Sequence, residues 1–170
     1  MFGKVWKQKK TLGVALLAAI VFAGLLSLVV GVVPALATPP DGISASPIAA
    51  GALDEPIRAK FKDGAGGFGD GTDVTNLMMV KFDLQPGGTF GWHEHGGPVW
   101  AIIASGTLTL YDEACQAETV SAGGALLDAG NHTHIAYNHG SEPVEIYATF
   151  MLPAGGAPRI DAPDPGTCTS

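Results

Sequence analysis

All five histidines of this 170-residue chain fall between residues 93 and 139, and two of them stand one residue apart in His93-Glu94-His95. Residues two apart on a β-strand point to the same face, so both imidazoles would face one way. Imidazoles that converge on one point are suited to binding a divalent transition metal. The spacing alone does not separate such a site from two ordinary buried or exposed histidines.

The segments that would position these side chains have the pattern of an all-β domain. Residues 80–84 alternate apolar and polar side chains, and residues 144–150 do the same. This period of two predicts strands, whereas no stretch after residue 40 has the 3.6-residue period of an amphipathic helix. Nine or ten short strands would form a sandwich or a barrel. Turns are expected at residues 63–71, 86–88, 111–116, 123–124 and 138–140.

The region around the two histidines resembles the first motif of the cupin superfamily. That motif is a Gly, five residues, His-x-His, three or four residues, Glu, six residues and a second Gly. Gly87, His93, His95 and Gly106 stand at their motif positions. Val99 stands at the position of the Glu, and its side chain cannot bind a metal.

The second cupin motif, which ends in His and Asn four residues apart, is matched more loosely. His134 and Asn138 have this spacing. Ala129 and Asn131 stand where the motif has Pro and Gly, and Asn tolerates the left-handed backbone that a Gly turn requires. The alternative alignment matches Gly130 and allows one extra residue before His134.

The resemblance covers residues 74–152 and implies a double-stranded β-helix, the jelly-roll barrel of the cupins, with inward histidines on neighbouring strands. The expected organisation is a signal peptide or signal anchor at 1–37, a linker or edge strand at 38–55, the barrel at 56–152 and a tail over its surface at 153–170.

The resemblance also implies a metal site. His93, His95 and His134 would bind one divalent transition metal, which could be Fe, Zn, Mn, Ni or Cu. His132 shares the parity of His134 and could replace it or serve beside it as an acid–base group. A barrel that has lost its metal, in keeping with the missing Glu, is the alternative.

Further residues are expected around the metal. Glu94 points opposite to its neighbours on a regular strand, so it is a surface residue or a hydrogen-bonding partner of a ligand. Asn138 is either a site residue or a turn residue. The pocket wall is assigned to four side chains, the last three by their shared inward parity: Trp92, Val99, Ala101 and Ile103.

Two classes of function follow from the resemblance. The first is a metal-dependent enzyme with oxygenase or isomerase chemistry on a small organic molecule. The second is a non-catalytic barrel that binds a small ligand or a metal, which an apolar interior would favour. The fold alone does not choose between them. The expected partner is a small molecule, with a homodimer as an open alternative to a monomer.

The N-terminal segment predicts export. Residues 1–10 carry four lysines and no acid, and an apolar run from 11 to 33 leads to Ala35-Leu36-Ala37. This layout favours a signal peptide cleaved before Thr38. The apolar run is also long enough to span a bilayer, so a single-pass anchor that leaves the domain outside is the alternative.

Net charge and cysteine content limit the possible binding partners and the cellular compartment. Loss of the four N-terminal lysines would lower the net charge from −7 to −11, which excludes nucleic-acid binding and attraction to anionic lipids. Cys115 and Cys168 are the two cysteines. Outside the cytoplasm they are expected to form a disulfide, with free thiols as the alternative.

Overall fold

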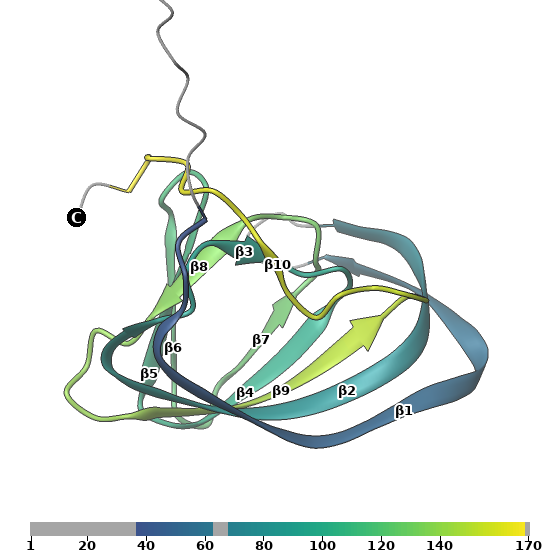
Figure 1. Ribbon diagram of the computed structural model, residues 1–170, viewed down its shortest axis with the longest axis horizontal. Coiled ribbons are helices and arrows are strands. Elements are labelled where there is room, and N and C mark those ends of the chain that lie inside the picture. The colour runs from purple at the N-terminus through teal and green to yellow at the C-terminus, as the bar shows by residue number, and fades with distance from the viewer. Residues whose placement is uncertain (1–36, 63–67, 169–170) are drawn as a thin grey trace, which may run out of the picture. The chain divides into compact units, whose positions relative to one another are not determined.

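The computed structural model describes residues 37–62 and 68–168, and these residues form an all-β domain (Figure 1). No helix occurs among them, and so none that could cross a membrane. Residues 1–36, which hold nearly all of the predicted signal or anchor segment, lie outside the described residues. The strands are β1 (Asp41–Lys62), β2 (Phe68–Thr89), β3 (His93–Glu94), β4 (Val99–Ser105), β5 (Thr107–Asp112), β6 (Ala117–Ser121), β7 (Ala125–Asp128), β8 (His134–Tyr137), β9 (Val144–Leu152) and β10 (Ile160–Asp161).

The strands form one strongly curved sheet in the order β10-β3-β8-β2-β9-β4-β7, with antiparallel neighbours throughout. β1 pairs with β2, β5 with β8, and β6 with β5. The sheet curls into a nearly closed barrel, which Figure 1 shows with β3, β8 and β10 across from β4, β7 and β9. The predicted cupin-type barrel is confirmed.

The barrel interior is the apolar face of the alternating strands. Every second residue of β9 is buried, beginning with Val144. The register pairs Val144 with Leu84 and Ala148 with Val80, so the apolar faces of β2 and β9 coincide. Each large aliphatic side chain buried in this way contributes about 1.5–3 kcal/mol. The period of two therefore predicted the correct inward face of both strands.

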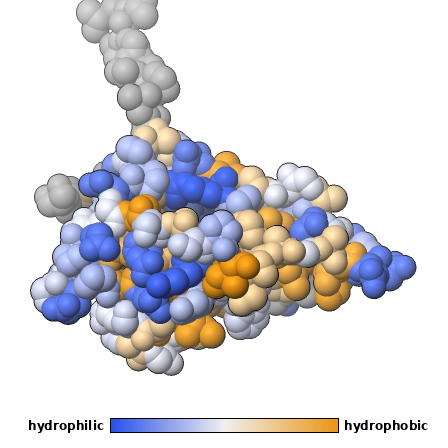
Figure 2. Space-filling view, turned by 60° about the horizontal axis from the view of Figure 1, so that its bottom comes forward, coloured by the Kyte–Doolittle hydropathy of each residue, from blue (hydrophilic) through white to orange (hydrophobic). Residues whose placement is uncertain are grey.

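The outward face of the same strands is mixed in polarity. Met79, Trp100, Ile102 and Tyr147 are 37–56% exposed. On the face seen in Figure 2, hydrophobic patches are separated by hydrophilic ones. The register places these side chains on neighbouring strands, because Met79 and Trp100 both pair with Thr149 and Ile102 pairs with Tyr147, so they lie side by side on the outer face.

The N-terminal strand is longer than the sequence predicts. An edge strand is expected near residues 43–49 within a linker, whereas β1 is a single strand from 41 to 62 that pairs with β2. Its residues are mostly exposed, so β1 has no apolar alternation to reveal it. The turn expected at 86–88 is instead an irregularity inside β2, between Leu84 and Thr89.

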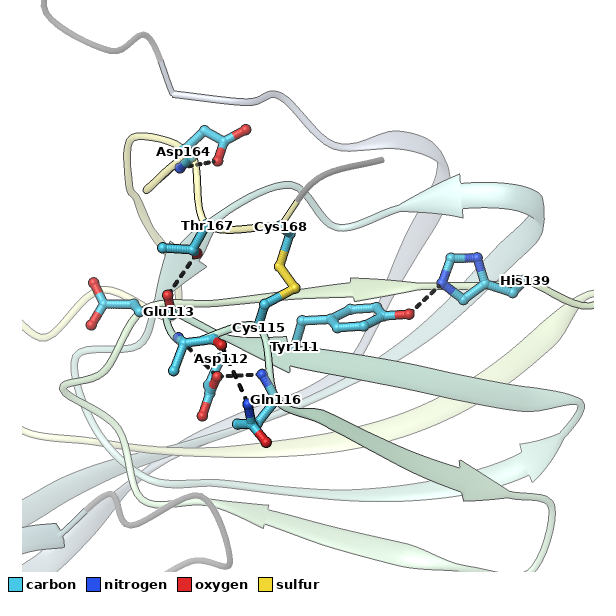
Figure 3. The surroundings of a disulfide bond; sticks show 11 residues. Tyr111, Asp112, Glu113, Cys115, Gln116, His139, Asp164, Thr167 and Cys168 are labelled. Atoms are coloured by element: carbon cyan, nitrogen blue, oxygen red, sulfur yellow. Dashed lines mark hydrogen bonds between the residues drawn. A yellow bond between two sulfur atoms is a disulfide. The ribbon is translucent and has the colours of Figure 1, made fainter.

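The C-terminal segment contributes one short strand to the sheet. β10 pairs with β3, which places Asp161 opposite His93. The disulfide between Cys115 and Cys168 ties the end of this segment to the β5–β6 turn, as predicted (Figure 3). Figure 3 also shows the Thr167 hydroxyl donating to the backbone carbonyl of Glu113. The sequence predicted the anchor but not the strand pairing.

Candidate metal centre

Three of the five histidines meet inside the barrel. His93 lies on β3 and pairs across the sheet with His134 on β8, while His95 follows β3 directly. Their exposed fractions are 3%, 6% and 8% respectively. The centroids of their rings lie 4.4–5.1 Å apart. One nitrogen from each ring lies within 4.8 Å of those of the other two, close enough to hold one ion.

Hydrogen bonds fix which nitrogen of each ring faces the others. Nδ1 of His93 donates to the Gly91 carbonyl at 2.7 Å, and Nδ1 of His95 donates to the Pro158 carbonyl at 2.6 Å. Since a carbonyl only accepts, the proton sits on Nδ1 and the lone pair sits on Nε2. Such outer hydrogen bonds are what orient metal-binding histidines.

The loop before β3 holds one of these carbonyls in place. Gly91 has a φ of 68°, and a Cβ there would overlap the Thr38 carbonyl oxygen. Thr38 in turn accepts the backbone N–H of Trp92 on its hydroxyl at 2.8 Å. Glycine is required by this close approach, which puts the Gly91 carbonyl beneath the ring of His93.

Burial lowers the pKa of all three imidazoles. Burial, reinforced by the neighbouring histidines, lowers the pKa of His93 to about 2. Burial also lowers the pKa of His134 to about 4, against the opposing effect of the Asp128 carboxylate. The pKa of His95 is lowered by burial as well. Neutral imidazole is the form that binds a cation.

A buried carboxylate that sequence reasoning missed lies beside the histidines. Asp128 ends β7 and is 6% exposed. Its Oδ2 lies 3.3 Å from Nδ1 of His134 and 3.6 Å from Nε2 of His95. Its Oδ1 accepts the backbone N–H of Gly130 at 2.6 Å. Among the described residues, no group meets full hydrogen-bond geometry to Oδ2.

The sheet register explains the position of this carboxylate. Asp128 on β7 pairs with Val99 on β4, so the two side chains lie on the same face of the sheet. Val99 stands where the first motif has Glu. Asp128, on the adjacent strand, places a carboxylate on the same face of the sheet. One feature of the sequence could have indicated that Asp128 points inward: it lies two residues after the apolar Leu126 and so shares its face of the strand.

The remaining candidates are placed outside the trio of histidines. His132 lies 3.6 Å from Asp128 Oδ1 and, with His134, forms a second group that could hold a cation. The Asn138 amide donates to two backbone carbonyls, of Leu84 and Glu142, and its Oδ1 accepts the Gly140 N–H, so it is a structural turn residue. Asn131 has the left-handed φ of 59° that the second motif suggested.

Two further candidates do not reach the centre. Glu94 pairs with Ile160 of β10, one residue out of phase with the inward His93. His139 is exposed, and its Nε2 lies 3.1 Å from the Tyr111 hydroxyl (Figure 3).

A cavity of about 410 Å³ opens beside the histidines. Its wall is mostly apolar and includes Val99 and Ala101, as predicted from their parity. Ile103 is fully buried in the adjoining core and does not line the cavity. The pocket role predicted for Trp92 is not seen, since its ring packs with Ile135 and Ala162 in a separate cluster. Neighbours on a strand face opposite ways, and Trp92 precedes the inward His93.

Comparison with known proteins identifies the domain type. Residues 80–150 match the family model described as "Cupin domain". No curated protein matches the sequence. Among solved structures, the chain is similar to a cupin superfamily protein from Desulfitobacterium hafniense, at 10% identity over 69% of this chain and 84% of that chain, with a TM-score of 0.46.

Two further solved structures are similar at the same level. A conserved protein with a double-stranded β-helix domain from Klebsiella pneumoniae is 21% identical over 63% of this chain and 86% of its own, with a TM-score of 0.42. A cupin 2 conserved barrel domain protein from Leptotrichia buccalis is 12% identical over 68% and 44%, with a TM-score of 0.46. The assignment rests on the family match.

Proposed function

This chain contains a cupin domain in residues 80–150, and we propose that the domain binds one divalent transition metal through His93, His95 and His134. The observation that carries the proposal is that one nitrogen of each buried ring lies within 4.8 Å of the other two. Zinc, iron, manganese, nickel and copper all accept such imidazole ligands at about 2.0–2.2 Å.

The donor set fits such an ion in charge as well as in number. The three rings are neutral, with Nδ1 of His93 and His95 already donating to carbonyls. Asp128 brings a negative charge to the same place, and its Oδ2 lies in reach of two of the rings without a well-formed hydrogen bond. A buried carboxylate in this state is costly unless a cation or a proton compensates it.

The cavity would hold a small organic molecule against the metal. Its apolar wall excludes water, which strengthens electrostatic interactions at the metal. A bound metal would supply Lewis-acid or oxygen-activating chemistry. Asp128 would orient His134 through Nδ1, and all three of Asp128, His132 and His134 line a neighbouring cavity. These roles favour an enzyme with oxygenase or isomerase chemistry.

The second candidate is a non-catalytic barrel that binds a small ligand or the metal alone. The observation that favours it is the wall formed by Val99, Ala101 and their apolar neighbours, which offers no acid or base to a substrate. Turnover of metal-loaded protein against a panel of small organic acids, with and without oxygen, would separate the two candidates.

We also propose that the domain acts outside the cytoplasm. A disulfide between Cys115 and Cys168 supports folding in an oxidising compartment. If the signal is cleaved as proposed, N-terminal sequencing of exported protein should read from Thr38. An intact Met1 together with a need for detergent would favour the membrane-anchored form.

The metal itself is tested by elemental analysis of protein purified from its native compartment without chelators. We expect one equivalent of a first-row transition metal, lost on treatment with a strong chelator and regained on addition of the same ion. Protein that takes up no metal above pH 7 at micromolar concentrations would contradict the proposal.

A further inference from the structure

One positive charge lines the cavity beside the histidines. Arg159 lies between Pro158, whose carbonyl holds His95, and β10, which pairs with β3. Its Nε donates to Asp161 at 2.6 Å. Its Nη2 is buried and finds no hydrogen-bond partner within the described part of the chain. Arg159 therefore lines the cavity and has one unsatisfied donor.

Nothing in the apolar wall can satisfy this donor. Apart from the histidines, the charged side chains that line the cavity are Asp128 and Arg159, and no ion pair joins these two in the described structure. Asp161 pairs with the guanidinium at Nε, but leaving the buried Nη2 without an acceptor is costly, and a carboxylate is its best-matched partner. The missing acceptor is thus expected to come from a ligand.

The charge balance of the cavity points the same way. A divalent cation on the histidines and the guanidinium of Arg159 outweigh the negative charges of Asp128 and of Asp161, which pairs with Arg159. The interior would be positive although the chain as a whole carries a net charge of −7. An anion would be drawn to this interior and repelled elsewhere on the surface, which gives selectivity for where it binds.

We propose that the cavity binds a small organic carboxylate, whose carboxylate group bonds Arg159 and whose apolar body lies along the wall formed by Val99, Ala101 and Phe150. The inference rests on the proposed function in one respect only, since the metal adds to the positive charge. Arg159 would be a substrate-binding residue that no cupin motif identified in the sequence contains.

The test compares hexanoate with hexan-1-ol, which share a six-carbon chain and differ in charge. Binding to metal-loaded and to metal-free protein is measured by calorimetry, after the metal content of each sample has been determined. We expect hexanoate to bind at least about ten-fold more tightly than hexan-1-ol, since a charge-assisted hydrogen bond contributes about 1.5–3 kcal/mol.

Three variants assign the effect to Arg159. Arg159→Gln should bring hexanoate down to the affinity of hexan-1-ol, and Arg159→Lys should fall between, because it keeps the charge and loses the planar fork. Arg58→Gln is the matched control, since it makes the same charge change at the chain's other arginine, which is exposed on β1, and should bind hexanoate like the parent.

The outcomes separate this inference from the proposed function. Protein that holds one metal yet binds both probes equally would overturn the inference alone. Unchanged hexanoate affinity in Arg159→Gln would also overturn it, because the carboxylate would then be bound by the metal. An equal loss for both probes would show that Arg159 only supports the wall. An Arg159-dependent preference in protein that takes up no metal would sustain the inference and reject the metal.

Discussion

Histidine rings lie near the C-terminal segment in two regions: the cavity, and the region around the Cys115–Cys168 disulfide, which we call the corner. The surroundings of the rings differ between the two regions. In the cavity, His93 and His95 are buried, their Nδ1 atoms donate to backbone carbonyls, and Nε2 remains available. At the corner, His139 is exposed and its Nε2 is engaged with the Tyr111 hydroxyl (Figure 3). Its ring also stacks on Tyr137 at 5.3 Å. Burial and the ring nitrogen that is hydrogen-bonded, rather than residue type, distinguish the cavity histidines from the surface histidine.

The largest difference between the two regions is expected in the metal content of variants that lack one histidine ring. His93→Ala, His95→Ala or His134→Ala should abolish stoichiometric metal, since one ligand among three supplies roughly 3 kcal/mol or more of affinity, over about 100-fold. His139→Ala and His132→Ala should leave one equivalent bound. Elemental analysis with circular dichroism, to verify folding, measures both. A His93→Ala protein that retains one equivalent would place the metal elsewhere.

Acid should destabilise the metal-free cavity while sparing the corner. The folded pKa values of His93 and His134 are about 2 and 4, below an unfolded value near 6.5. The unfolded chain therefore binds more protons below pH 6.5, and the free energy of unfolding falls as the pH falls through that value. Between pH 7 and 5 each such histidine costs about 2 kcal/mol.

Urea denaturation of chelator-treated protein at pH 7 and pH 5 measures this loss. The His93→Ala variant should lose less stability over the same interval. Equal pH dependence in His93→Ala and the parent would mean that His93 is not held neutral by burial.

Removal of the disulfide should lower the stability of the corner. It should also weaken the cavity, because the C-terminal segment carries both Cys168 and β10. Cys115 and Cys168 are separated by 53 residues, so the chain-entropy model gives about 4 kcal/mol of stability. A Cys115→Ser, Cys168→Ser protein should unfold at lower urea and, while folded, bind metal more weakly. Thiol labelling of denatured, unreduced parent protein should find no free sulfhydryl. Unchanged metal affinity in the double variant would show that β10 docks without the disulfide.

The smallest expected effect concerns the carboxylate beside the rings. Asp128→Asn keeps the size of the side chain and removes its charge from Nδ1 of His134. Loss of such an orienting partner typically lowers metal affinity 10–100-fold. Competition titration with a chromophoric chelator measures it, with Asp164→Asn in the exposed C-terminal segment as the matched control. An unaltered affinity would leave Asp128 without a role at the metal.

The alternation of apolar and polar residues predicted the strands and their inward faces. It did not predict which residues pair across the sheet. Alternation placed Val99 and Ala101 on the cavity wall correctly. The same rule, applied to the neighbour of His93, would have turned Trp92 away from the cavity. Asp128 was missed because its importance comes from the β4–β7 register, which pairs it with Val99. Periodicity gives the face of a residue and says nothing of its cross-strand partner.

The contacts of the C-terminal segment were missed for the same reason. Its Pro and Asp content resembles a surface tail, yet the Pro158 carbonyl holds the ring of His95 and Ile160 pairs with Glu94. Both contacts join positions more than 60 residues apart. No pattern of side chains in either segment predicts these contacts.

The bond between Pro158 and His95 sets an order of events during biosynthesis. A growing chain holds all three rings long before Pro158 has been made, but until that carbonyl docks, His95 is free to turn and to bind a cation in either tautomer. If the three rings bind a metal, the complete site would form only after the Pro158 carbonyl has reached His95. If the domain folds after export, the metal would be chosen from the ions present in that compartment, and the place of folding would influence its identity as much as the ligands do.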